Sequence, residues 1–182
     1  MNMKKITVLF AFAVFILASP AAQSQTFDEG DNVLNLTIGF GSTVFPGGYN
    51  QAPGLAVAFD HCFWGDLING DFSIGMGGYL GMGWSGYSYL GSDYNYVGFL
   101  PGVRGNFHWT GVENLDLYAG LLTGARLYNG DYDGNFGYAE PHHGVYTNAY
   151  VGARYYFSDT FCVVGELGAG ITYANVGVGF KF

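Results

Sequence analysis

The residue types needed for acyl transfer occur in the polar connecting segments of the sequence. A serine hydroxyl becomes a nucleophile when a histidine takes its proton and a carboxylate orients that histidine. The residues that supply these types are Ser85, Ser88, Asp93, Glu140, His142 and His143. They match no recognisable catalytic motif. The two adjacent histidines would point to opposite sides of an extended chain, and no third metal ligand is fixed by spacing. We therefore expect a polar loop tip here, with neither a metal nor a cofactor.

A second set of residues is placed for ion pairing. Its members are Asp60, Arg104, Asp116, Arg126, Arg154, Glu166 and Lys181. Each lies in a segment where apolar and polar residues alternate, and each falls in the polar phase. Buried charges are costly unless they are paired, and three acids nearly balance four bases. If the polar phase faces an enclosed space, we expect an internal ion-pair network. Inward tyrosines would join it, and they are Tyr79, Tyr118, Tyr146, Tyr150 and Tyr173.

The elements that must position these residues are β-strands. Alternation of apolar and polar residues with a period of two is typical of a strand with two different faces. In the segment 33–42, for example, Leu36 and Ile38 lie in one phase while Asn35 and Thr37 lie in the other. Eight segments show this pattern, and they are 33–42, 54–63, 71–84, 95–109, 114–128, 144–157, 160–169 and 171–182. The connectors 43–53, 85–93 and 129–143 are long and polar, whereas several of the others are short.

The placement of charge decides what the apolar faces contact. In these segments the apolar phase contains no charged residue, and only 11% of the whole chain is charged, against about 25% in a typical soluble domain. A soluble barrel would place its charges outside, whereas a charge on a lipid-facing surface costs about 2–4 kcal/mol at the bilayer midplane. We therefore expect the apolar faces to contact lipid. Aromatic residues suited to interfacial girdles are Phe63, Trp84, Trp109, Tyr155, Phe157, Phe161 and Phe182.

The N-terminal region has the features of a secretory signal peptide. Lys4 and Lys5 precede the apolar run ITVLFAFAVFILA, and small residues follow it. We predict a signal peptide at 1–24, a short periplasmic segment at 25–32 and a barrel at 33–182. Removal of the signal would leave four basic residues against 14 acidic ones, which argues against nucleic acid as a partner.

The signal peptide, the eight alternating segments and the terminal VGVGFKF resemble the small outer-membrane β-barrel proteins, the class that contains OmpX and the transmembrane domain of OmpA. The resemblance covers residues 30–182 and implies an all-β fold. The fold would be an eight-stranded antiparallel up-and-down transmembrane barrel in the cell outer membrane of a Gram-negative envelope. The resemblance also implies that the barrel-assembly machinery recognises the C-terminal strand through Val176, Val178, Phe180 and Phe182.

An eight-stranded barrel has room inside only for its own side chains, so we expect a filled lumen. A gated ion path is the alternative for the same residues. Cys62 and Cys162 both fall in the inward phase, on the second and seventh strands. That separation favours two free buried thiols over a disulfide, which needs Cα atoms within about 7 Å.

The sequence favours a monomeric structural barrel that binds or adheres through its outer loops and is not an enzyme. Its partners would be outer-membrane lipid, the assembly machinery and a surface ligand. One alternative is a lipid-modifying enzyme of the acyltransferase or lipid A deacylase type, since some eight-stranded outer-membrane barrels have these activities. A narrow ion channel is the second alternative.

Overall fold

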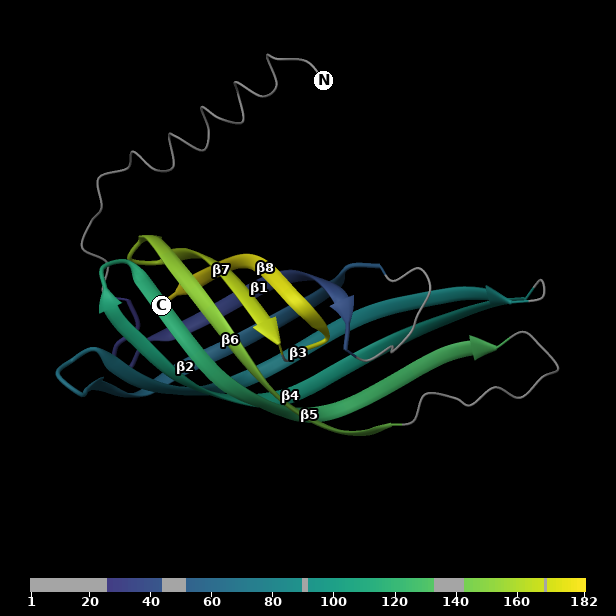
Figure 1. Cartoon of the computed structure of the whole chain (residues 1–182), viewed down its shortest axis with the longest axis horizontal. Coiled ribbons are helices and arrows are strands. Elements are labelled where there is room, and N and C mark those ends of the chain that lie inside the picture. The colour runs from purple at the N-terminus through teal and green to yellow at the C-terminus, as the bar shows by residue number, and fades with distance from the viewer. Residues whose placement is uncertain (1–25, 44–51, 90–91, 133–142, 169) are drawn as a thin grey trace, which may run out of the picture.

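The computed structural model describes residues 26–43, 52–89, 92–132, 143–168 and 170–182, which form eight strands in a closed antiparallel barrel (Figure 1). The strands are β1 (Asn32–Ser42), β2 (Gly54–Leu67), β3 (Phe72–Tyr89), β4 (Ser92–Val112), β5 (Leu115–Tyr132), β6 (Gly144–Ser158), β7 (Phe161–Gly168) and β8 (Thr172–Lys181). Each strand pairs with the next, and β8 pairs with β1. The predicted eight-stranded up-and-down barrel is confirmed, while the predicted signal peptide lies outside the described residues.

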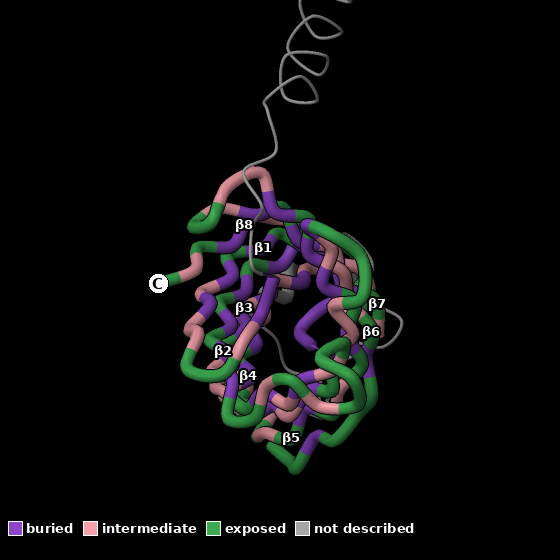
Figure 2. The backbone as a smooth tube through the Cα atoms, turned by 90° about the vertical axis from the view of Figure 1, so that its left-hand side faces the viewer, coloured by how far each residue is buried: buried purple, intermediate pink, exposed green. Residues whose placement is uncertain are grey.

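Burial alternates along the strands as the sequence pattern predicted (Figure 2). On β2, Leu55 and Val57 are exposed on the outer surface while Ala58 and Asp60 are buried inside. Every strand contributes large exposed apolar residues, among them Leu36, Leu55, Leu80, Val103, Leu121, Val151, Leu167 and Val176. The barrel is therefore apolar outside and holds its charged side chains, together with a smaller apolar cluster, inside, whereas a soluble protein exposes its charges. No helix in the described part of the chain is long and apolar enough to cross a membrane.

The barrel wall is much higher on one side than on the other. β3, β4 and β5 contain 18, 21 and 18 residues, whereas a membrane-spanning strand needs about 9–11. Near the start of β2, Leu55 pairs with Met82, but β3 continues to Tyr89. At about 3.3 Å per residue, the part of β3 beyond Met82 therefore adds about 20 Å to the wall. We call the protruding part of β3–β6 the outer extension, comprising 83–89, 92–98, 126–132 and 143–149; it projects to the right in Figure 1.

The outer extension corrects the prediction of long loops at 85–93 and 129–143. Most of the first segment is a paired hairpin, with a register that runs from Trp84 opposite Val97 to Tyr89 opposite Ser92. The second segment begins as strand and leaves β5 only after Tyr132. Ser, Asn and Gly are common in loops, but Tyr favours strands, and pairing with a neighbouring strand outweighs the loop preference here.

Tyr173 also differs from its predicted position. Its side chain is 58% exposed beside Gly41 rather than inside the barrel. Ile171 and Thr172 are both buried, because the chain enters β8 from within the barrel mouth. Tyr173 and Ala174 then both lie on the outer side, and regular alternation starts only at Asn175, so the phase of Tyr173 differs from the prediction.

Neighbouring glycines on β3 show how closely the wall is packed on its inner side. A methyl group at Gly77, which faces inward, would collide with the backbone carbonyl of Phe59. A methyl group at Gly78, which faces outward, would have no neighbour within 4 Å. Backbone atoms of the adjacent strand cannot move aside as a flexible side chain could.

We predict opposite effects for alanine at these two positions. Gly77→Ala should lower the free energy of unfolding by about 1–3 kcal/mol, because it overpacks the wall against backbone. Gly78→Ala should leave it unchanged or raise it by up to about 1 kcal/mol, because alanine loses less backbone entropy than glycine. Denaturant unfolding of the refolded protein in lipid vesicles measures both. Equal losses in the two variants would contradict the described packing.

Candidate functional site

The lumen contains a continuous ion-pair network centred on Asp60. Arg104 Nε lies 2.9 Å from Asp60 Oδ1, and Arg154 pairs with the other oxygen, Oδ2. Arg104 Nη2 also lies 2.8 Å from Glu166 Oε1, and Arg154 Nη1 lies 3.0 Å from Asp116 Oδ2. All five side chains are buried. The network joins β2, β4, β5, β6 and β7 across the interior, so it ties opposite parts of the wall together.

Neutral donors and rings complete the network. Asn106 Nδ2 donates to Asp60 at 2.8 Å, and the Tyr118 hydroxyl donates to Glu166 at 2.6 Å. His108 Nδ1 donates to Asp116 Oδ1 at 2.8 Å. The Arg154 guanidinium also lies 4.6 Å from the centre of the Tyr118 ring. Each carboxylate therefore accepts from at least two groups, which is the condition under which a buried charge is tolerated.

Two of the seven predicted network members lie elsewhere. Arg126 is level with Gly144 in the outer extension, where its guanidinium is 4.4 Å from the Tyr146 ring centre. Lys181 lies at the opposite end, where Nζ is 3.3 Å from Asp31 Oδ2. Both residues are in the polar phase, but strand register places them too far along the barrel axis to reach Asp60. Asp31, which the sequence analysis assigned no role, is the partner of Lys181.

The N-terminal segment closes the end of the barrel that holds the C-terminus. Phe27 is fully buried, and its ring centre lies 4.3 Å from that of His108. Ser73 Oγ donates to the Phe27 carbonyl at 3.0 Å, and Gly30 N donates to the Cys62 carbonyl at 3.0 Å. Residues 26–31 therefore fold into the barrel mouth. Partial burial, with Asp31 nearby, raises the pKa of Asp28 in this segment.

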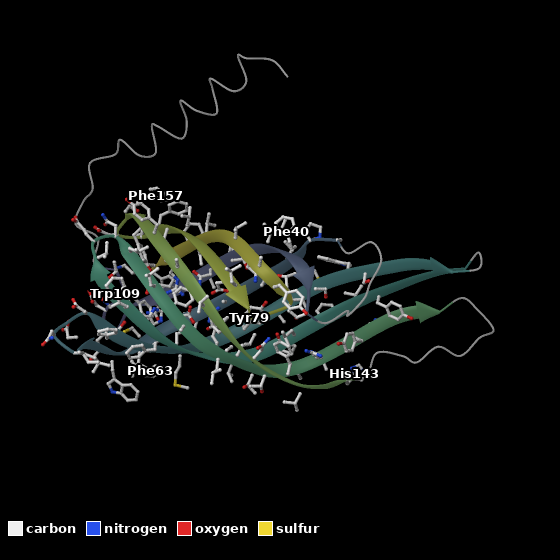
Figure 3. The ribbon with its side chains drawn as sticks, viewed as in Figure 1. Phe40, Phe63, Tyr79, Trp109, His143 and Phe157 are labelled. Carbon is white, nitrogen blue, oxygen red and sulfur yellow. The ribbon has the colours of Figure 1, made fainter. Side chains whose placement is uncertain are left out.

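The opposite end of the lumen is closed by Ile171, which precedes β8. Its backbone N donates to the Tyr79 hydroxyl at 2.9 Å, and its carbonyl accepts from Thr43 N at 3.1 Å. The Ile171 side chain is fully buried in an apolar cluster with Leu100 and Leu122. Tyr79, labelled in Figure 3, is itself buried. Buried side chains therefore occur along the lumen from Phe27 at one end to Ile171 at the other.

The inner side of the outer extension is lined by aromatic and polar residues. Tyr96 and Tyr128 pack against the apolar cluster beneath them. Tyr128 N donates to His143 Nδ1 at 3.2 Å, and Asn148 Nδ2 donates to the Tyr146 hydroxyl at 3.2 Å. Tyrosine rings with hydrogen-bonding side chains between them are a composition typical of adaptable recognition surfaces.

The candidate acyl-transfer residues are only partly described. Ser85 is buried on the inner side of β3, and His143 contacts Tyr128. The side chains of Ser88 and Asp93, together with Glu140 and His142, lie outside the described residues. Among the described residues, no group of three or more His, Cys, Asp or Glu side chains could hold a metal ion.

Aromatic residues predicted for the girdles lie on the outer surface, but Trp84 lies apart from the residues named below, opposite Val97 in the outer extension. Phe63, Trp109 and Phe157 lie around the end of the barrel that holds the short turns (Figure 3). Phe157 lies between Tyr155 and Phe161, with ring-centre separations of 5.1 and 6.3 Å. Cys62 and Cys162 are free and buried, as expected.

Solved structures share this fold. No protein-family model matches the sequence, and no curated protein does. The attachment invasion locus protein Ail of Yersinia pestis is similar with a TM-score of 0.52 and 15% sequence identity, over 85% of this chain and 99% of that one. Ail in complex with the heparin analogue sucrose octasulfate has a TM-score of 0.53 and 16% sequence identity, again over 85% of this chain and 99% of that one. The N-terminal barrel of Pseudomonas aeruginosa OprF has a TM-score of 0.46 and 16% sequence identity, over 85% of this chain and 99% of that one. The fold of the small outer-membrane β-barrels, expected from the sequence, is confirmed.

We predict that the two arginines differ sharply in their effect on stability. Arg154→Met leaves Asp60 and Asp116 buried with one cation fewer, so it should lower the free energy of unfolding by about 3–5 kcal/mol. Arg126→Met removes mainly a cation–π contact at the rim and should cost about 1 kcal/mol or less. Denaturant unfolding in detergent micelles compares them. A loss for Arg126→Met as large as that for Arg154→Met would contradict the central role of the network.

Proposed function

We propose that this chain, which has the fold of the small outer-membrane β-barrels, is a scaffold that presents the outer extension at the cell surface for ligand binding. The observation that carries the proposal is the combination of a lumen crossed by a buried ion-pair network with a wall that rises about 20 Å above the start of β2. A wall needed only to span the membrane would not require strands of 18 and 21 residues. The added length therefore serves a purpose outside the bilayer.

The outward surface supports the outer-membrane location. Leu80, Val103 and Leu121 are each more than half exposed, and similar residues surround the barrel. Soluble monomers rarely expose contiguous apolar patches larger than a few hundred Å2. Hydrocarbon around the wall removes that cost, and the girdle aromatics then lie at the interface with water.

The composition of the outer extension narrows the class of ligand. Arg104 and Arg154 are committed to the lumen network and Lys181 lies at the opposite end, so Arg126 is the basic residue of the extension. Ail has been solved with a heparin analogue, but a polysulfated chain is recognised by clustered cations. The tyrosines and amides here suit a ligand that is bound by ring stacking and neutral hydrogen bonds, such as a glycan or a peptide segment.

We predict that substitutions in the extension weaken binding without affecting the fold. The triple variant Arg126→Ala, Tyr128→Ala, His143→Ala should reduce adherence of bacteria displaying the protein to immobilised glycans and matrix proteins by about tenfold, since each of these side chains borders the recognition surface. Gly78→Ala, on the lipid-facing side, is the matched control. Unchanged adherence with correctly folded protein would refute the binding role. So would a lipid A or phospholipid profile that changes in a deletion strain and is restored only when the candidate Ser and His residues are intact.

We also propose that the last strand acts as the assembly signal. Phe180 and Phe182 are exposed on the lipid side, and the Phe182 backbone exchanges hydrogen bonds with Asn32 at 3.0 and 3.1 Å. Phe182→Ala should slow insertion by purified barrel-assembly machinery about tenfold, because a strand-end aromatic anchor is lost. Tyr173→Ala, which removes an exposed ring at the other end of the same strand, is the control. Equal insertion rates for the two variants would count against the signal.

A further inference from the structure

The lipid-facing wall contains a depression over β4–β8. Its volume is about 720 Å3, and its lining includes Trp109, Leu117, Ala153, Gly165, Leu167 and Val176. These side chains all belong to the outward phase, so the depression opens toward the lipid. It lies in the wall itself, away from the outer extension.

Small residues on adjacent strands create this depression. Ala153 on β6 pairs with Gly165 on β7, between Leu117 on β5 and Val176 on β8. A Cβ atom added at Gly165 would meet no atom within 4 Å. Larger residues therefore form the two sides, and the floor is nearly bare backbone.

The packing of the barrel does not explain the glycine at this position. The inward-facing glycines are required by the packing inside the barrel. A methyl group at Gly152 would collide with the Tyr118 ring, and one at Gly177 would collide with the Leu36 carbonyl. Gly165 has no such neighbour, and a glycine within a strand weakens it. The space at Gly165 is therefore available only to something that approaches from outside the barrel.

We propose that one acyl chain of a phospholipid from the periplasmic leaflet occupies this depression. The depression is continuous with the surface that already faces hydrocarbon, and its lining side chains on the outer face carry no charge. A flexible chain can follow a bare floor between Leu117 and Val176, which increases the number of van der Waals contacts. Trp109, at the girdle end, would then lie near the lipid carbonyls.

This inference depends on the membrane location but not on ligand binding by the outer extension. It can therefore fail while the proposed function holds, and the reverse is also true. A phospholipid is favoured over lipid A because the girdle end of the depression is the end that holds the C-terminus and the short turns, which is periplasmic in a barrel of this type.

The test fills the depression and leaves a matched glycine position as a control. Gly165→Leu places a side chain on the floor, whereas Gly78→Leu makes the same change at another outward glycine with open space, on β3. The three proteins, wild type included, are refolded into vesicles of phosphatidylethanolamine, phosphatidylglycerol and lipid A. They are then released into detergent and weighed by native mass spectrometry.

Wild type and Gly78→Leu should each retain one phospholipid. Gly165→Leu should retain about tenfold less, which corresponds to the loss of roughly two buried methylene groups. Equal retention in Gly165→Leu and wild type would overturn the proposal, as would equal loss in Gly78→Leu. Retention of lipid A or of a second protein copy in place of phospholipid would also overturn it. If Gly165→Leu fails to fold, Ala153→Leu fills the same depression from β6 and must give the same loss.

Discussion

In hydrocarbon, every polar group of the chain must find its partner within the protein, and this constraint governs the structure. For the backbone it requires closure of the sheet, which β1 and β8 provide by pairing from Val33 opposite Lys181 to Ser42 opposite Thr172. For the side chains it requires that polar residues face inward. The same inward face must then accommodate charges that no bulk water solvates, so the two requirements together lead to the Asp60 network.

The network in turn determines what the lumen can do. Asp60 is shared by two guanidiniums, and each guanidinium reaches a second carboxylate on another strand. Moving any one of these side chains would leave a buried partner unsatisfied, so the interior resists rearrangement. Phe27 and Ile171 then close the two ends with apolar contacts. The wall is therefore a rigid support, and the interactions proposed above are assigned to its outer rim and its lipid-facing surface.

Sequence alternation was sufficient to predict the number of strands and the orientation of most of their side chains, because a period of two reflects only which face a residue occupies. It could not predict position along the barrel axis. Arg126 and Arg154 share a phase, yet register places one at the rim and the other beside Asp60. Phe27 and Ile171 escaped prediction for a different reason. Phe27 precedes the first alternating segment, and Ile171 is only the first residue of the last one. The burial of each depends on space left at the barrel ends by residues distant in the sequence.

The unequal height of the wall links the fold to the proposed ligand binding. β6 begins at Gly144 but pairs with β7 only from Tyr150 onward. Among the described residues, the part of β6 in the extension therefore has no β7 partner, and the wall is open on that side. In a closed tube of uniform height, the tyrosines on the inner side of the extension would be buried against one another. The one-sided wall instead leaves Asn148 and His143 exposed. At the base of the wall, Ile171 gives the surface a floor, and its backbone is held by Tyr79 and Thr43. The residue that seals the lumen thus also supports the surface that a ligand would meet.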